Sequence, residues 1–288
     1  MGEILLASNP PRRKVLNIKI NPRFGMLRSA WWQGSGGDIA SNILQVLSMI
    51  RQDQFESFFY LTIDDGPSAD TSEKIRLLAD HKILAIWFCL GKNLENYPET
   101  AMQLIESGHV IGNHSYAHPH FSAITLDECR DEIVRTEKII EELYSKSDAQ
   151  RPAKLFRFPF GDQGHLENGK PSNNPEKLLH KARLQQLLKD MGFQKKPVSP
   201  VEHHGVCSNQ PADIDWLWSY DIRDWAIGHT DGFRLSPEKV TKNLISFLKN
   251  YDKKKNQIIL THDHEKTAQY FPYFIEAFSE RGLAFYLP

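Results

Sequence analysis

The feature that most constrains the fold of this chain is a regular alternation of short apolar runs with longer segments of helical period. The runs are rich in aromatic and β-branched residues and end at turn residues, which is typical of buried strands; they cover 58–63, 83–90, 109–114, 154–159, 216–221, 257–262 and 283–288. Apolar residues at spacings of three and four predict helices within 68–82, 97–108, 125–144, 174–192 and 236–255. Repeated strand and helix predict parallel strands covered by helices, in an α/β barrel or an open α/β sheet.

Several of the helical segments also carry start signals. Asp70 or Ser72 stands before the first helix within 68–82, Pro98 lies near the start of the second, and Thr125 with Glu128 has the spacing of a capping box. These signals support the helical interpretation, because each would satisfy or avoid unpaired N–H groups in the first turn of a helix.

Two regions fit the alternation less well. Residues 1–56 precede the first strand and helix and include WWQGSGGD at 31–38, where no GK[ST] sequence follows, so a plain turn is favoured over a phosphate-binding loop. Residues 162–215 mix loops rich in Gly, Asn and Pro with one helix. We therefore predict an N-terminal extension over 1–56, packed on one main domain over 57–288, in which 162–215 form an elaborated connection.

Composition argues against a protein that binds nucleic acid or a charged membrane surface. A chain of 288 residues can bury one large core, and its 35 basic and 36 acidic residues nearly cancel, so no strong field would attract nucleic acid or anionic lipid. Cys89, Cys129 and Cys207 are widely spaced and suit buried free thiols. No signal peptide or membrane span is recognised, so we expect a soluble protein that is cytoplasmic as the sequence stands, a monomer or small homo-oligomer.

Polar residues of complementary type stand at the ends of five predicted strands. Asp64 and Asp65 close the first strand, and by its two-residue period they point in different directions, although an Asx turn before Gly-Pro is the simpler alternative. His114 and His118 are four residues apart and can face one point, as in an open zinc site, whereas isolated HxxxH pairs also occur by chance. His120 is expected at the surface or in support of this pair.

The other three strand ends carry a guanidinium, acids and an imidazole. Arg157 lies among aromatic residues and would need a carboxylate partner if buried; the alternative is an edge strand with its arginine in water. Asp221 and Asp224 interrupt the next strand beside Trp225, where exposed loop acids and a packing tryptophan are the alternative. His262 ends a further strand, where a satisfied core histidine is the usual explanation.

Taken together, these strand ends predict a single reactive site. In α/β folds with parallel strands the chemistry gathers at the C-terminal ends of the strands. Five independent coincidences of acids, imidazoles and a guanidinium at such ends are improbable, so a shared site is favoured over the separate alternatives.

The ordered motifs resemble those of the polysaccharide deacetylase family, the NodB homology domain of carbohydrate esterase family 4. That family's TFDDGP, H[S/T]xxHP, RxPxG, DxxDW and LxH correspond in order to TIDDGP, HSYAHP, RFPFG, DIRDW and LTH here, over residues 58–265. The resemblance implies an incomplete (β/α)7 barrel, to which this chain adds an N-terminal extension and a long insertion after the third motif.

The resemblance implies a metal site and a base beside it. Asp65, His114 and His118 would hold a divalent metal, usually Zn2+, with Co2+, Mn2+ or Ni2+ as alternatives. Asp64 would be the general base, and Arg157 would orient it and keep it ionised.

The remaining implied roles concern the leaving group and the pocket. His262 would be the general acid, and Asp224 would tune it. The backbone N–H of Phe160, at a position where the family often has tyrosine, would serve the oxyanion, while Trp225 and Leu260 would shape the pocket for the acetyl methyl.

The expected activity is that of a metal-dependent hydrolase that removes N-acetyl groups from N-acetylglucosamine-type sugars or polysaccharides. Two other hydrolases stay open at this point: an O-acetyl esterase acting on xylan-like glycans, and a hydrolase of a small non-sugar amide. An inactive relative that binds glycans is the alternative of another class. The expected partner is an acetylated carbohydrate, with no nucleic acid and no membrane span.

Overall fold

The structure is a computed structural model that describes residues 2–8, 12–18, 58–195, 212–230, 232–253 and 255–288. The chain divides into two compact units, Met1–Phe55 and Glu56–Pro288. In the first unit, β1 (Gly2–Ser8) and β2 (Arg12–Ile18) form an antiparallel hairpin that the sequence patterns do not predict. The turn predicted at 31–38 lies outside the described residues, and the packing of the extension on the main domain stays a prediction.

The second unit is built on a parallel sheet with the strand order β5–β4–β3–β9–β8. Its strands are β3 (Phe59–Asp64), β4 (Ile86–Cys89), β5 (Val110–Asn113), β8 (Tyr220–Asp221) and β9 (Gln257–His262). Since all of them run in one direction, their C-terminal ends meet at one edge. The register pairs Asp64 of β3 with His262 of β9, so the ends of these two strands lie side by side.

Three predicted strands are reduced to isolated bridges or to two residues. Residues 154–159 make only the isolated bridge between Asn113 and Phe156, residues 283–288 only that between Phe59 and Phe285, and 216–221 reduce to β8. The carbonyl oxygen of Phe156 nevertheless accepts a hydrogen bond from the N–H of Trp216 at 2.8 Å. Single hydrogen bonds therefore connect these neighbouring segments where a ladder is absent. Pro159 ends the first of these segments, because proline has no N–H to extend a ladder.

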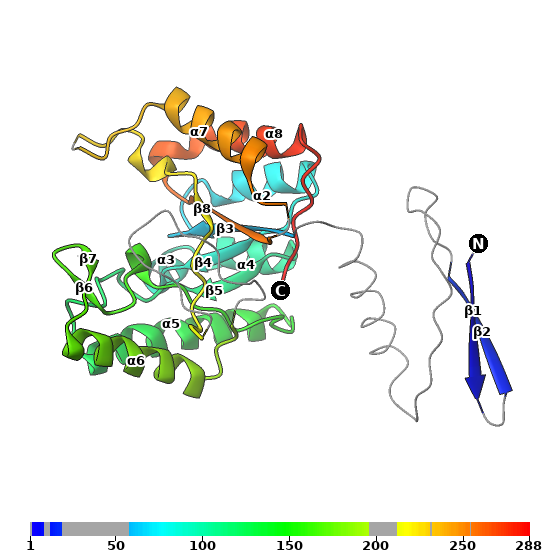
Figure 1. Cartoon of the computed structure of the whole chain (residues 1–288), viewed down its shortest axis with the longest axis horizontal. Coiled ribbons are helices and arrows are strands. Elements are labelled where there is room, and N and C mark those ends of the chain that lie inside the picture. The colour runs from blue at the N-terminus through cyan, green and yellow to red at the C-terminus, as the bar shows by residue number, and fades with distance from the viewer. Residues whose placement is uncertain (1, 9–11, 19–57, 196–211, 231, 254) are drawn as a thin grey trace. The chain divides into compact units, whose positions relative to one another are not determined.

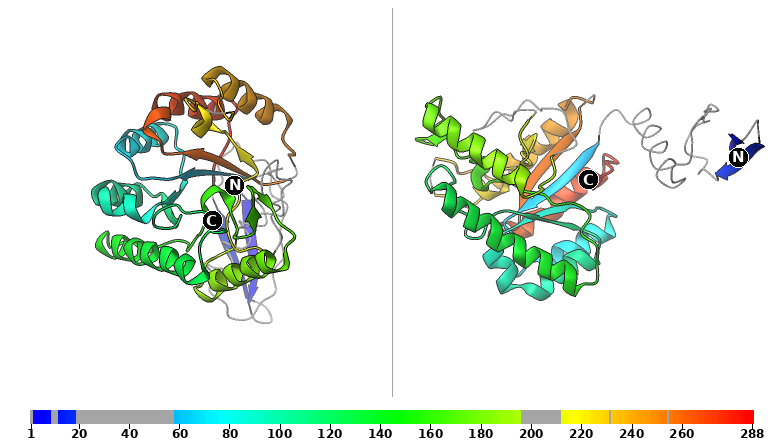
Figure 2. Two further views of the ribbon diagram at one scale, coloured as in Figure 1. Left: turned by 90° about the vertical axis from the view of Figure 1, so that its left-hand side faces the viewer. Right: turned by 90° about the horizontal axis from the view of Figure 1, so that it is seen from below.

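Helices surround this sheet (Figures 1 and 2). Those expected from the sequence are α2 (Thr71–Asp80), α4 (Pro98–Glu106), α5 (Leu126–Lys146), α6 (Pro175–Asp190) and α7 (Pro237–Asn250). Sequence periodicity does not predict α3 (Gly91–Asn96) or the largely apolar α8 (Phe271–Ser279). The capping box of α5 is confirmed, since Thr125 and Glu128 exchange side-chain and backbone hydrogen bonds.

Short elements complete the second unit. Strands β6 (Leu166–Glu167) and β7 (Lys170–Pro171) pair as a small hairpin in the predicted insertion, and the 3-10 helices are η1 (Pro159–Gly161), η2 (Asp224–Ala226) and η3 (Glu265–Tyr270). The helices η1 and η2 overlap the third and fourth sequence motifs, and η3 begins at Glu265, shortly after the fifth. No helix in the described part of the chain is both long and apolar enough to cross a lipid bilayer.

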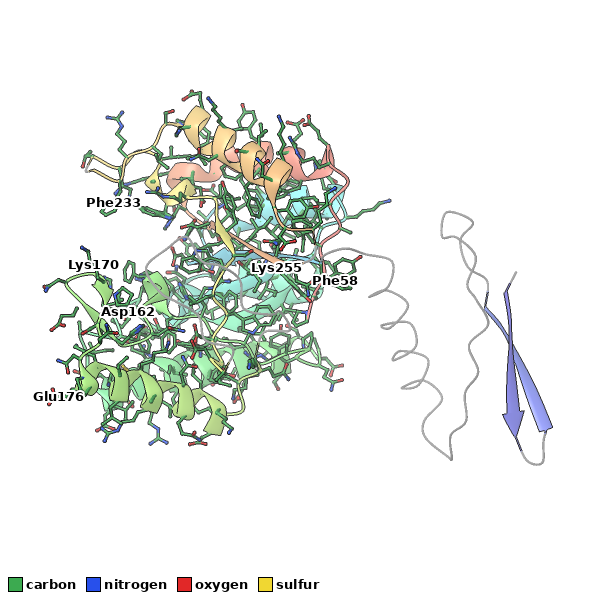
Figure 3. All side chains as sticks on the ribbon, viewed as in Figure 1. Phe58, Asp162, Lys170, Glu176, Phe233 and Lys255 are labelled. Carbon is green, nitrogen blue, oxygen red and sulfur yellow. The ribbon has the colours of Figure 1, made fainter. Side chains whose placement is uncertain are left out.

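The two-residue period of β3 divides its side chains between two environments. Phe59, Leu61 and Ile63 pack in the large cluster that the helices cover, whereas Tyr60 belongs to a second cluster inside the curved sheet. Figure 3 shows side chains packed on both faces of the sheet. Asp64 shares the parity of Tyr60, so the strand that anchors the core also turns this carboxylate toward the interior.

The cysteines follow the prediction where the structure describes them. Cys89 and Cys129 are buried free thiols, packed in different hydrophobic clusters, and burial raises the pKa of both. Cys207 lies outside the described residues.

Candidate active site

A cavity of about 1410 Å³ opens at the C-terminal ends of the strands and gathers the residues that the motifs single out. Eight of the ten predicted site residues line it: Asp64, Asp65, His114, His118, Phe160, Trp225, Leu260 and His262. The other two, Arg157 and Asp224, lie behind this lining, in contact with Asp64 and His262. The structure therefore brings all ten residues to one place.

Asp64 and Arg157 form a buried ion pair beneath the cavity. Arg157 is fully buried, and its Nη1 donates to Asp64 Oδ1 at 2.7 Å and to Thr62 Oγ1 at 2.9 Å, which excludes an exposed edge-strand arginine. Its guanidinium also lies 4.3 Å from the ring centre of Phe88. Burial raises the pKa of Asp64, and Arg157 opposes that rise, so the arginine offsets only part of the cost of burying the carboxylate.

Asp65 stands on a turned backbone that separates it from Asp64. Its φ is 71°, a left-handed conformation that aspartate tolerates better than most residues. Its N–H donates to Phe88 at 3.1 Å and its carbonyl accepts from Asn93 at 2.6 Å. Its Oδ1 lies 3.6 Å from His114 Nε2 and 3.3 Å from His118 Nε2, is buried, and has no hydrogen-bond partner among the described residues.

The Nε2 atoms of both histidines face this oxygen. His114 is buried, and its Nδ1 contacts the carbonyl oxygen of Arg157 at 2.8 Å, which fixes Nδ1 as the protonated nitrogen and leaves Nε2 as an acceptor. Burial lowers the pKa of His114 to about 3 and that of His118 to about 2, so both rings are neutral at neutral pH. Neutral imidazoles are the form that binds metals.

This donor set fits a divalent transition metal. Donor atoms of Asp65, His114 and His118 all lie within 4.8 Å of one another, and one buried carboxylate oxygen with two neutral imidazoles is a common set for an open zinc site. His114 Nε2 is 3.6 Å from an oxygen of Asp64 as well, so distance alone does not choose between the aspartates. Pairing does, since Asp64 binds Arg157 whereas Asp65 Oδ1 is unpaired among the described residues.

A second close group of possible donors, Asp221, Asp224 and His262, is already engaged internally. His262 Nδ1 lies 2.9 Å from Asp224 Oδ1, and the His262 N–H donates to Asp224 Oδ2 at 3.0 Å. Burial alone would lower the pKa of His262, but the charge and hydrogen bond of Asp224, helped by Asp221, raise it to about 10. His262 is therefore a cation at neutral pH, with its Nδ1 held by Asp224.

The predicted pocket residues form walls around these groups. Phe160 is 49% exposed, has φ 58°, stacks on His120 at 4.0 Å and meets His118 edge-on at 4.4 Å. Leu260 is buried at the base of the cavity. Trp225 Nε1 donates to Asp221 Oδ2 at 3.0 Å, so Asp221, to which the sequence assigns no role, holds the tryptophan of its own motif.

A buried aspartate that the sequence does not predict, Asp263, links the loop that carries Asp65, the metal half of the site, to the strand end that carries His262, the acid half. The side chain of Asp263 is fully buried and accepts from Ser68 N at 3.0 Å, Ser68 Oγ at 2.9 Å, Thr71 Oγ1 and Lys74 Nζ. It thereby joins the loop after Asp65 to the residue after His262. The sequence offers little signal for this, because Lys74 resembles any polar residue on a helix.

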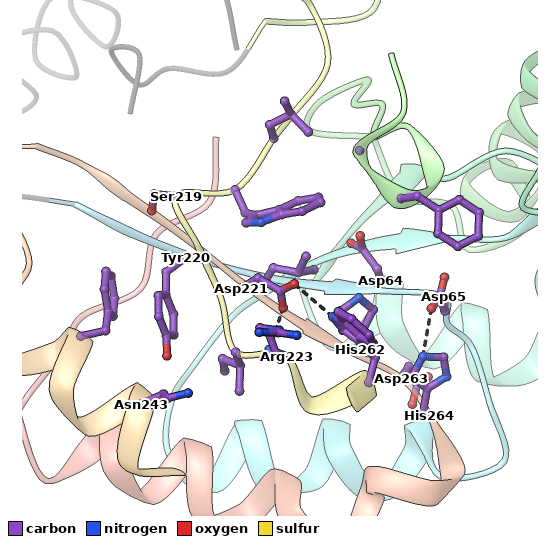
Figure 4. Close-up of a pocket in the computed structure, with 18 of the residues that line it drawn as sticks. Asp64, Asp65, Ser219, Tyr220, Asp221, Arg223, Asn243, His262, Asp263 and His264 are labelled. Carbon is purple, nitrogen blue, oxygen red and sulfur yellow. Dashed lines mark hydrogen bonds and ion pairs between the residues drawn. The ribbon is translucent and has the colours of Figure 1, made fainter. Parts of the chain in front are cut away.

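His264 is a further histidine that the motifs do not assign (Figure 4). Its Nε2 lies 3.2 Å from Asp65 Oδ2, and its ring lies nearly parallel to that of His262, 5.5 Å away between ring centres. The signal available in the sequence is the second histidine in THDHE, which reads equally well as an exposed loop residue.

Comparisons with known proteins support the motif interpretation. The family model described as polysaccharide deacetylase matches residues 51–170. Peptidoglycan-N-acetylglucosamine deacetylase of Bacillus cereus is 39% identical over 103 residues, which are 35% of this chain and 36% of that protein. Peptidoglycan-N-acetylmuramic acid deacetylase PdaC of Bacillus subtilis is 33% identical over 121 residues, 41% of this chain and 25% of that protein. This chain thus spans about a quarter to a third of the length of these relatives.

Solved structures extend the similarity over more of the chain. A family 4 carbohydrate esterase from Streptomyces lividans, in complex with acetate, superposes with a TM-score of 0.52 and 21% identity over 81% of this chain and 93% of that one. At this identity the similarity shows the fold alone, and it confirms the predicted NodB-type fold class. The matched family model, the motif order and the shared fold together confirm the predicted resemblance of this chain to the polysaccharide deacetylase family.

Proposed function

We propose that this protein is a metal-dependent deacetylase that hydrolyses the acetamide of N-acetylglucosamine-type sugars in a polysaccharide or its fragments. The observation that carries the proposal is the register that sets Asp64 beside His262 at the ends of adjacent strands. One strand end thus offers a proton acceptor and the other a proton donor, next to the three metal-binding candidates. Hydrolysis of an amide needs these functions together.

Asp65, His114 and His118 would hold the metal, Zn2+ or another divalent ion such as Co2+, Mn2+ or Ni2+. A metal bound there supplies a Lewis acid that polarises the acetyl carbonyl and makes a water molecule more acidic. The buried, unpaired Oδ1 of Asp65 supports this assignment, because a buried carboxylate oxygen without a partner is costly unless a cation or a donor meets it.

Asp64 would accept the proton of the attacking water. Arg157 and the strand fix its position, so the carboxylate does not need to reorient during the reaction. Its pKa, which burial raises and Arg157 counteracts, makes it a stronger proton acceptor than an exposed aspartate. The strength of Asp64 as a base therefore depends on how far Arg157 offsets the rise of its pKa that burial causes.

His262 would donate a proton to the departing amine. An amide nitrogen is a very poor leaving group unless it is protonated, and Asp224 keeps this imidazole cationic through neutral pH. The base must be ionised while the acid is protonated, so the rate should follow a bell-shaped pH profile whose two limbs belong to the pair.

The pocket walls would select and stabilise the acetyl group. The N–H of Phe160 is proposed to donate to the developing oxyanion, an interaction typically worth roughly 3–4 kcal/mol when it is removed. Leu260 and Trp225, which line the cavity, would enclose the acetyl methyl. The exposed face of Phe160 beside His118 offers an apolar surface where a sugar ring would approach.

An O-acetyl esterase acting on xylan-like glycans, or a hydrolase of a small non-sugar amide, is the second candidate. A strongly protonated His262 favours amide over ester, since an alkoxide leaves far more readily than an amide nitrogen and depends less on an acid. The names of the two curated relatives also refer to N-acetylated sugars of peptidoglycan. An inactive glycan-binding relative has less support, because each group needed for hydrolysis has a partner or position suited to its role.

The test is acetate release from N-acetylglucosamine oligomers, peptidoglycan fragments and acetylxylan, with the protein loaded with Zn2+ or treated with a chelator. We expect release from an N-acetylated substrate, its loss on chelation, and its recovery when the metal is returned. Release from acetylxylan alone would favour the esterase. No acetate from any acetylated saccharide by metal-loaded protein would refute the proposal.

A further inference from the structure

His264 lies where the two halves of the proposed site meet, one residue beyond the Asp263 anchor (Figure 4). It precedes η3 and lines the same cavity as Asp65 and His262. Its side chain is 41% exposed, so its place is not dictated by core packing. Core packing therefore does not explain why its side chain lies beside Asp65 and His262.

The carboxylate of Asp65 has two oxygens in different surroundings. Oδ1 faces His114 and His118, at 3.6 Å and 3.3 Å from their Nε2 atoms, and is otherwise unpaired among the described residues. Oδ2 lies 3.2 Å from His264 Nε2. Hydrogen bonds through Asp65 N and O fix its backbone but do not fix rotation of the carboxylate. The contact at Oδ2 supplies that constraint.

The same geometry argues against His264 as a further metal ligand. The donor atoms of Asp65, His114 and His118 cluster within 4.8 Å of one another, and the described residues add no fourth donor to this group. His264 approaches Asp65 from the other oxygen. It is thus placed to orient a ligand rather than to be one.

We infer that His264 is a positioning residue of the proposed metal site, which holds Asp65 through Oδ2 so that Oδ1 points toward His114 and His118. The inference rests on the proposed function, because it presumes that these three residues bind a metal. Partners that orient metal ligands typically change metal affinity or activity by about 10- to 100-fold when they are lost. Its ring also lies nearly parallel to that of His262, 5.5 Å away between ring centres, so the same side chain neighbours both the proposed metal ligand Asp65 and the proposed acid His262.

The experiment measures the Zn2+ affinity of the full chain by competition with a chromophoric chelator, for the parent, His264→Ala and His264→Gln. The control is His81→Gln, since His81 ends α2, contacts Ser279 and does not line the cavity. We expect His264→Ala to bind Zn2+ about 10- to 100-fold more weakly. The amide N–H of His264→Gln can reach Oδ2, so that variant should keep most of the parent's affinity, and the His81 control should match the parent.

Each other outcome overturns a specific statement. Unchanged affinity in His264→Ala, or an equal loss in the Ala and Gln variants, would refute positioning through the Nε2 contact. Loss of the bound equivalent of Zn2+ in both variants would make His264 a direct ligand, which also refutes the inference. A parent that binds no Zn2+ would refute the proposed metal site itself, a result visible before any variant is compared.

Discussion

Replacing Asp224 by asparagine should remove most of the proton affinity of His262. The substitution keeps the size of the side chain but removes the negative charge that faces Nδ1 at 2.9 Å. The pKa of His262 lies at about 10 instead of 6.5, a difference that corresponds to about 5 kcal/mol of preference for the charged ring. Burial lowers this pKa, so without Asp224 the ring should titrate near or below 6.5.

The assay is an NMR titration of the His262 ring in metal-free parent and variant proteins, followed by the pH profile of kcat/KM for the metal-loaded forms. In Asp224→Asn the basic limb should move to lower pH, because the acid loses its proton earlier. Asp221→Asn is the matched control, since Asp221 raises the same pKa less and bonds Trp225 instead. A His262 that still titrates near 10 in Asp224→Asn would refute the assignment of Asp224.

The same pair sets a dependence of stability on pH. Because the folded pKa of His262 is raised, its contribution is complete below pH 6.5 and is lost as the pH rises toward about 10. The free energy of unfolding of the parent should therefore fall over this range, relative to Asp224→Asn. Parallel curves for the two proteins would contradict the reasoning.

Two predictions concern residues outside the reaction itself. Burial lowers the pKa of His109 to about 4. The free energy of unfolding of the parent should therefore fall by up to about 3 kcal/mol as the pH falls from 6.5 to 4. Calorimetry should not find this loss in His109→Asn, because the asparagine side chain does not titrate. Lys74→Met should cost about 3–5 kcal/mol in denaturant unfolding, because it leaves Asp263 as a buried charge without its cation, and Lys74→Met with Asp263→Asn should recover part of it. A cost below 1 kcal/mol would contradict the anchoring role.

The sequence predicted the parts of this molecule that local patterns encode. The ends of β3, β5 and β9 carry the expected side chains, because an apolar run followed by a turn marks a strand end without knowledge of its neighbours. Arg157 was ambiguous by itself, since nothing local distinguishes a buried arginine from an exposed one. Its burial follows from a carboxylate that lies 93 residues earlier in the chain.

What the sequence missed depends on contacts between distant segments. Asp263 meets Lys74 across 189 residues, and neither residue breaks the polar pattern of its own segment. His264 acquires its role from the turned backbone of Asp65, which no periodicity describes. The prediction of a regular strand at 154–159 was wrong for a related reason, because the neighbouring segments make isolated hydrogen bonds with it and no continuous ladder.

The separate roles of Asp64 and Asp65 are tested most directly by measuring bound Zn2+ and acetate release together for the parent, Asp64→Asn and Asp65→Ala. Asp64 is bonded to Arg157, whereas Asp65 Oδ1 faces the two imidazoles, so the adjacent carboxylates should do different work. Asp64→Asn should keep its Zn2+ and lose turnover by about 10²–10⁴-fold, as removal of a general base typically does. Asp65→Ala should lose Zn2+ itself. Equal loss of Zn2+ from both variants would contradict the assignment of Asp65 to the metal and Asp64 to the base.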